Sequence, residues 1–183
     1  MSDSPNNPVQ ELSTPKKSIK LLIKESYIEV IKKSVGANLF QNLYAEVDGE
    51  KTDILQNGRR SCAVFVSRIL FMFKLIHDLH ASVYEVVRDL ESSDWEKAGK
   101  PEPGDVLVYE TKKFQEEGDE ERNHAAFYIG SDEAVSTYYK VSQPIKHHYT
   151  YGTKDGEPVR KVVAIYRYDF DANHEKVLAR KLS

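Results

Sequence analysis

The chain has 183 residues, of which 40% are hydrophobic and 10% aromatic, and this length and composition suit one folded domain with a sizeable core. Its 26 basic and 29 acidic residues give a formal net charge of −3, which removes the electrostatic footprint of a general nucleic-acid binder. A single cysteine excludes an internal disulfide. Because residues 1–17 also contain no apolar stretch typical of a secretion signal, we expect a cytoplasmic protein. The longest apolar run, residues 62–73, is interrupted by Ser67 and Arg68, so no membrane span is predicted.

The N-terminal region divides into a tail and a helix. Residues 1–17 are rich in Ser, Pro, Asn and Lys without periodicity, which predicts a disordered tail. From Ser18, a candidate N-cap, to Gly36 the apolar residues recur at helical spacing, and this predicts an amphipathic helix over about 18–36. We expect residues 18–183 to form a single α+β domain in which this helix is an extra N-terminal element.

Two more helices are predicted in the first half of the chain. Residues 40–55 read as a short hairpin around the turn signal Asp48-Gly49. The next apolar stretch, residues 63–76, is hydrophobic on most faces and predicts a nearly buried helix that Ser61 caps. The pattern Ser82-Val83-Tyr84-Glu85 is a capping box and predicts the start of a further helix.

After Trp95 the pattern changes to β-branched and aromatic runs separated by Gly, Asp and Pro. Helices followed by a set of strands favour an α+β fold, with the helices packed on an antiparallel sheet.

Cys62 is a candidate nucleophile because it lies where the buried helix is expected to begin. Unpaired backbone N–H groups and the positive end of the helix dipole favour a thiolate there, and Arg59 and Arg60 add positive charge. A buried cysteine is also commonly an inert packing residue, so its position alone does not establish a role.

A catalytic thiol needs a base, and an imidazole is the usual one at neutral pH. Of the six histidines, His124 opens the run HAAFYIG, where the end of a strand can meet the start of a helix. His147 and His148 are adjacent on a predicted strand, so they should face opposite sides of the sheet. The remaining three are predicted to be solvated: His77, His80 and His174.

Three elements in order resemble the NlpC-type branch of the papain-like cysteine peptidases and amidases, which includes cell-wall hydrolases. They are the cysteine at the start of a buried helix, the run Pro103-Gly104-Asp105-Val106-Leu107-Val108-Tyr109, and the run His124-Ala125-Ala126-Phe127-Tyr128-Ile129-Gly130. The resemblance covers about residues 43–168. It implies a papain-like fold in which the cysteine-bearing helix packs on an antiparallel sheet.

The resemblance also implies the roles of individual residues. Cys62 would be the nucleophile and His124 the general base, together forming a thiolate–imidazolium pair that cleaves an amide through an acyl-enzyme. The residue that orients the imidazole would be Ser136 or His147. Tyr44 and Ser61 are the candidate substrate-binding residues.

One motif departs from the family pattern. At the nucleophile the family usually has Asp-Cys-Ser-Gly, whereas this chain has Ser61-Cys62-Ala63-Val64. In the cell-wall endopeptidases of this type the Asp and the Ser help to capture a free amine, so a substrate other than a cell-wall peptide is expected here.

The function expected from these features is that of a thiol hydrolase acting on a peptide or a small amide-containing substrate. Two alternatives use the same fold: a binding module that has lost turnover, and an acyltransferase that uses the same cysteine. We expect no cofactor and no metal, because one cysteine and scattered histidines lack the ligand spacing of a zinc site. Nucleic acid is not an expected partner.

Overall fold

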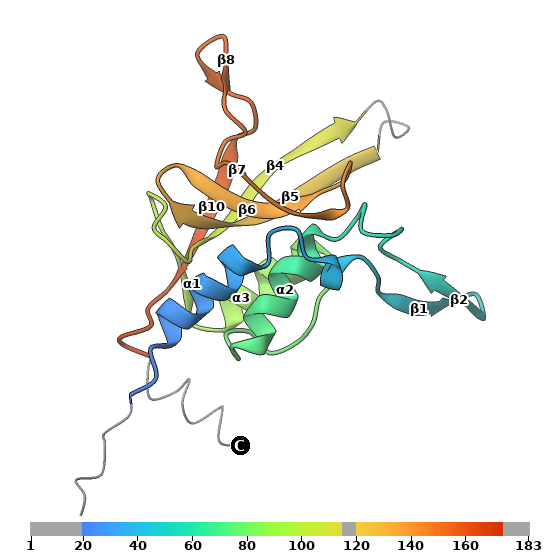
Figure 1. Cartoon of the computed structure of the whole chain (residues 1–183), viewed down its shortest axis with the longest axis horizontal. Helices are drawn as coiled ribbons and strands as arrows, with labels where there is room; N and C mark the ends of the chain where they lie inside the picture. Colours follow the sequence, from blue (N-terminus) through green and yellow to red (C-terminus); the bar gives the residue numbers. More distant parts are fainter. Residues whose placement is uncertain (1–19, 115–119, 174–183) are drawn as a thin grey trace, which may run out of the picture.

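The computed structural model describes residues 20–114 and 120–173 (Figure 1). The predicted tail, the candidate cap Ser18 and His174 lie outside these residues. Three α-helices lie on one face of a six-stranded antiparallel sheet, and this confirms the α+β prediction of helices packed on an antiparallel sheet (Figure 1). Within the described residues no helix is long and apolar enough to cross a membrane.

Helix α1, Ile23–Lys33, is shorter than the predicted range of 18–36. It buries Ile23, Tyr27 and Ile31 on one face, as the helical spacing requires, whereas the preceding Leu22 is 56% exposed and its side chain makes no cap. Tyr27 is fully buried, and its hydroxyl donates to the carbonyl oxygen of Gly104 at 3.0 Å. This bond ties α1 to the loop that leads into the sheet.

The predicted hairpin is present as β1, Tyr44–Val47, and β2, Glu50–Asp53. Its two turn residues, Asp48 and Gly49, both have positive φ, which matches the right-handed twist of the two strands. The pair forms its own two-stranded sheet and projects from the body of the molecule, after the short 3₁₀ helix η1, Asn38–Phe40 (Figure 1).

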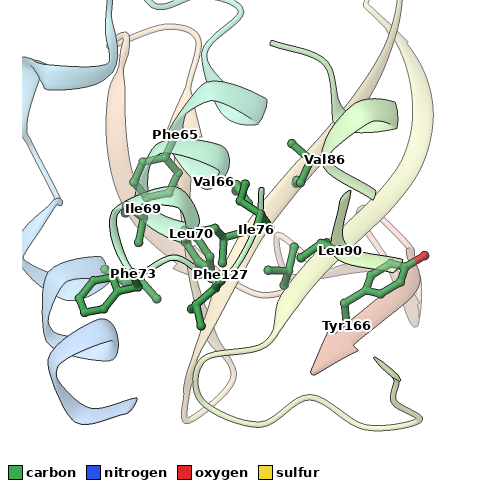
Figure 2. Close-up of a cluster of buried hydrophobic side chains, with 14 of the residues drawn as sticks. Phe65, Val66, Ile69, Leu70, Phe73, Ile76, Val86, Leu90, Phe127 and Tyr166 are labelled. Carbon is green, nitrogen blue, oxygen red and sulfur yellow. The ribbon is translucent and has the colours of Figure 1, made fainter. Parts of the chain in front are cut away.

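Helix α2, Cys62–Met72, and helix α3, Val83–Ser92, carry most of the core that faces the sheet (Figure 2). Seven of the eleven α2 residues are buried, as the apolar pattern predicted. The ring of Phe65 meets that of Phe127, on the central strand β5, Glu120–Gly130, edge to face at 5.5 Å. Burying each side chain of this size contributes about 2–3 kcal/mol, so α2 is fixed firmly on the sheet.

The prediction that Ser61 caps α2 is wrong. Ser61 precedes the helix, but its hydroxyl donates back to the carbonyl oxygen of Gly58 at 2.8 Å and makes no cap. The first N–H groups of α2 therefore receive no side-chain cap from Ser61.

At α3 the predicted capping box is present, because Ser82 Oγ accepts a hydrogen bond from the N–H of Glu85 at 3.2 Å. The prediction that His77 and His80 are solvated is wrong for His80, whose side chain is only 17% exposed. The buried carboxylate of Asp89 on α3 binds both rings, at 2.8 Å for His77 Nδ1 and 2.6 Å for His80 Nε2. These two histidines anchor the loop between α2 and α3 through Asp89.

The main sheet has the order β3-β10-β4-β5-β6-β7, with every neighbouring pair antiparallel. Its strands are β3 Trp95–Lys97, β4 Val106–Phe114, β5 Glu120–Gly130, β6 Glu133–Tyr138, β7 Gln143–His148 and β10 Val162–Tyr168. The short strands β8, Thr153–Lys154, and β9, Glu157–Pro158, form a separate hairpin (Figure 1).

The second face of the sheet has a smaller core of its own. Its buried members are Leu107, Tyr109, Ala126, Tyr128 and Ala134. Tyr149 and Tyr151, from the turn that follows β7, pack against this cluster. That turn therefore lies close to His124, which pairs with Tyr109 across β4 and β5.

Candidate active site

Cys62 and His124 line the same cavity, whose volume is about 550 Å³. Cys62 is the first residue of α2, and His124 lies on β5. The sulfur is 4.0 Å from the carbonyl oxygen of Asn123, the residue before His124. The packing of α2 on β5 thus brings the start of the helix to the strand that carries the histidine.

The cavity wall combines aromatic, small apolar and basic side chains. Four tyrosines and two valines give it apolar surface, and all of its charged members are cations: Arg59, Arg60, Lys112 and Arg160. The guanidinium of Arg160 is the most deeply placed of these, since Arg160 is 8% exposed. One of its N–H groups donates to the carbonyl oxygen of Glu110 at 3.2 Å.

Some groups around the Cys62 thiol raise its pKa and others lower it. Burial raises the pKa of Cys62, and this is the largest influence. The backbone N–H groups of Ala125, Ala63 and Cys62 itself, together with the charge of Arg160, offset part of that rise. The sulfur therefore faces a set of backbone donors, which is the arrangement that stabilises negative charge developing at this point.

His124 is 8% exposed, and its imidazole is held in the uncharged form. Burial lowers the pKa of His124 well below its ordinary value, and the nearby Arg160 and His147 lower it further. With a raised thiol pKa and a lowered imidazole pKa, the resting pair is a neutral thiol and a neutral imidazole. The thiolate–imidazolium pair that the resemblance implies is thus not the resting state that these shifts favour, because a dry site disfavours both charges.

Tyr151, which the sequence analysis did not single out, is the residue that contacts the imidazole. Its hydroxyl is 2.7 Å from His124 Nε2. As one of 11 tyrosines, in a turn rather than a strand, it carries no local sequence signal for this position. Only the fold of the segment after β7 over the second face of the sheet brings it to β5.

The two candidate orienting residues meet Tyr151. Ser136 Oγ is 3.0 Å from the Tyr151 hydroxyl and 2.8 Å from His147 Nε2. The ring of His147 stacks on that of Tyr151 at 4.0 Å with an angle of 13° between them. Ser136 and His147 are therefore brought together beside His124, with Tyr151 between them and the imidazole.

The two candidate substrate-binding residues are not among those that line the cavity. Tyr44 lies on the projecting hairpin, where it is 58% exposed and its ring contacts Lys51. Ser61 is 1% exposed, and its hydroxyl is occupied by Gly58. Neither side chain is placed to contact a substrate held in this cavity.

Within residues 20–114 and 120–173, no group of three or more His, Cys, Asp or Glu side chains is arranged to hold a metal ion. The chain matches no model of a known protein family, and no curated protein matches it significantly. Functional inference therefore rests on the geometry of the site.

Proposed function

We propose that this protein is a thiol hydrolase that cleaves an amide or peptide bond, with Cys62 as the nucleophile and His124 as the general base. The observation that carries the proposal is the shared cavity. A thiol at the N-terminal end of a buried helix and a strand histidine with an oriented imidazole line it together. The order of the cysteine helix and the antiparallel sheet also supports membership of the NlpC-type branch of the papain-like fold.

The reaction begins from the neutral pair. As Sγ attacks the carbonyl carbon, its proton passes to His124 and the oxygen gains negative charge. The N–H of Cys62 belongs to the first turn of α2, where it has no partner within the helix, and in the proposed mechanism it stabilises that oxygen. His124 then gives the proton to the leaving nitrogen as the C–N bond breaks, which leaves a thioester on Cys62.

Hydrolysis completes the cycle. His124 takes a proton from a water molecule that attacks the thioester, and as the C–S bond breaks it gives that proton to the sulfur, which restores the thiol as the acid leaves. The lowered pKa of His124 makes its protonated form a strong acid. It is consequently well suited to protonate a poor leaving group such as an amine.

Intact-mass spectrometry tests the proposal directly. Purified protein is treated with p-nitrophenyl esters of acyl groups with and without a carboxylate, because the charged side chains of the cavity are cations. We expect one acyl group on Cys62, with release of p-nitrophenol, followed by deacylation. Cys62→Ala should form no adduct, and His124→Ala should acylate at least about tenfold more slowly.

His77→Ala serves as the matched histidine control, since His77 lies at the Asp89 anchor and away from the cavity. Acylation that is independent of Cys62, or equally fast in wild type and His124→Ala, would contradict the proposal. Peptide amides of the acyl group that reacts fastest then establish whether amide bonds are cleaved.

A second candidate function is a binding module that keeps the fold without turnover. The raised pKa of Cys62 and the contact of its sulfur with a carbonyl oxygen favour an unreactive thiol, which is the observation behind this alternative. Absence of any acyl-enzyme, with an acyl ligand bound equally well by wild type and Cys62→Ala in calorimetry, would support it.

A further inference from the structure

The environment of His124 contains a continuous chain of hydrogen bonds that leads away from the cavity. It runs from His124 Nε2 to the hydroxyl of Tyr151 at 2.7 Å, on to Ser136 Oγ at 3.0 Å, and then to His147 Nε2 at 2.8 Å. The other ring nitrogen of His147, Nδ1, lies 2.8 Å from the carbonyl oxygen of His148. Four side chains and one carbonyl group thus form a single line.

The carbonyl oxygen at the far end sets the direction of every bond in this line. A carbonyl oxygen only accepts, so His147 Nδ1 carries a hydrogen and donates it. Burial lowers the pKa of His147, which keeps its ring neutral near pH 7. A neutral ring has one N–H, and therefore His147 Nε2 is an acceptor.

Each hydroxyl in the line has one hydrogen to donate. Ser136 donates its hydrogen to His147 Nε2, so it accepts from Tyr151. Burial raises the pKa of Tyr151 to about 12, and the phenol accordingly keeps its proton and donates it to Ser136. Having used its only hydrogen, Tyr151 accepts from His124, and this requires the hydrogen of His124 to lie on Nε2.

We propose that Tyr151, Ser136 and His147 are positioning residues whose relay holds the His124 proton on Nε2, leaving Nδ1 unprotonated to act as the base for Cys62. The catalytic part rests on the proposed function, whereas the tautomers are properties of the protein alone. The relay takes the place of a single side chain that orients the imidazole. Within it, Ser136 needs only a hydroxyl, which accepts from Tyr151 and donates to His147.

The backbone of the turn supports this role for Tyr151. Its φ is +61°, and among the described non-glycine residues with positive φ it is the only aromatic one. This left-handed region is unfavourable for a bulky side chain, so other contacts must hold Tyr151 there. His148 Nδ1 accepts from the N–H groups of Thr150 and Gly152, on either side of Tyr151, at 3.2 and 3.3 Å.

The adjacent histidines consequently have separate tasks. His147 points its ring into the relay, and His148 fastens the turn that presents Tyr151. Strained backbone that is held in place by its surroundings is a feature of functional sites, and it is seen here at the residue that contacts the imidazole.

Long-range proton–nitrogen NMR of the histidine rings tests the relay without any substrate. Near pH 7 we expect His124 as the Nε2–H tautomer and His147 as the opposite, Nδ1–H tautomer. His124→Ala and His147→Gln assign the two sets of signals. Finding either ring in the other tautomer in the wild-type protein would overturn the proposal.

Acylation kinetics test the catalytic part with matched variants. Tyr151→Phe keeps the stacked ring and removes the hydroxyl, and it should lower the maximal acylation rate at least about tenfold with little change in the concentration for half-maximal rate. Tyr149→Phe makes the same chemical change two residues away, where the hydroxyl takes no part in the relay, and should leave the rate unchanged. Ser136→Ala should slow the reaction, and Ser136→Thr, which restores a hydroxyl, should recover most of it.

The two kinds of measurement separate the two proposals. Opposite tautomers in a protein that forms no acyl-enzyme would retain the relay and reject the hydrolase. If Tyr151→Phe is acylated at the wild-type rate, and its thermal unfolding curve shows that it is folded, the relay is rejected as a positioning device. Cys62 and His124 are then retained as the reacting pair.

Discussion

The ionisation of Cys62 follows from the balance between burial and local donors. A thiolate in the cavity gains from three backbone N–H groups and from Arg160, but it loses more by leaving water. At His124 the influences add instead of opposing one another, because burial, Arg160 and His147 all lower its pKa. The resting pair is therefore neutral, and in the proposed mechanism the proton moves to His124 only during the attack.

Alkylation of Cys62 by iodoacetamide should follow this raised pKa. Because the thiolate is the reactive form, the rate should be low at pH 7 and rise steeply only above about pH 8.5, the ordinary value for a cysteine. Adduct formation is measured by intact mass between pH 6 and 10 at constant ionic strength. A plateau already reached at pH 7 would show a preformed thiolate and contradict the neutral resting pair.

The loop before α2 positions Cys62. In this loop Gly58 has φ +87° and packs closely against Ser142, in the turn between β6 and β7. A Cβ on Gly58 would lie 2.8 Å from the carbonyl oxygen of Ser142 and 3.2 Å from Cγ of Gln41. This contact holds the loop against the turn between β6 and β7. Ser61, the residue before α2, is tied to the same point, because its hydroxyl donates to the carbonyl oxygen of Gly58.

Gly58→Ala should therefore lower the free energy of unfolding by about 2–4 kcal/mol, from the unfavourable φ together with the backbone clash. Gly49→Ala is the matched control, because Gly49 has φ +84° but no atom within 4 Å of its added Cβ. That variant should lose only about 1–2 kcal/mol. Both values come from urea unfolding, and equal losses in the two variants would disprove the importance of the Ser142 contact.

For the whole molecule, His124 and His147 make the free energy of unfolding depend on pH. Burial lowers the pKa of both His124 and His147 in the folded protein, whereas in the unfolded chain each titrates near its ordinary value of about 6.5. Above that pH both histidines are neutral in the folded and in the unfolded chain, and their titration costs the folded protein no stability. Below it the unfolded chain binds more protons than the folded protein, so stability decreases as the pH falls toward the folded pKa values and levels off beneath them.

We expect the unfolding free energy to fall as the pH decreases from 6.5 toward 4.5, with a slope of at most about 1.4 kcal/mol per pH unit for each of these histidines. Two carboxylates with lowered pKa values contribute mainly below this window: Asp89 on α3, and Asp53 at the end of β2, whose pKa is lowered to about 2. Thermal unfolding across the range measures the slope. His147→Gln should reduce it, and an unchanged slope in that variant would show that His147 titrates alike in both states.

Local patterns accounted for much of the fold. The apolar run of α2, the capping box at Ser82 and the Asp48-Gly49 turn predicted elements that are present, because each depends on contacts within a few residues. The ends of α1 were less predictable, since no side-chain cap marks its start. The solvated reading of His80 was wrong because Asp89, nine residues away, supplies a buried partner that hydrophobic patterning does not reveal.

The sequence by itself predicted the helices and the antiparallel sheet, and it singled out Cys62 and His124 as the candidate pair, which line one cavity. Only the tertiary structure decided which groups surround them: Arg160 beside the thiol, Tyr151 at the imidazole, and Ser136 with His147 behind it. The physical reason is one of range. Helix caps, turns and apolar periodicity act over a few residues, whereas hydrogen-bond direction, burial and charge in the cavity depend on how α2, β5 and the turn after β7 pack together.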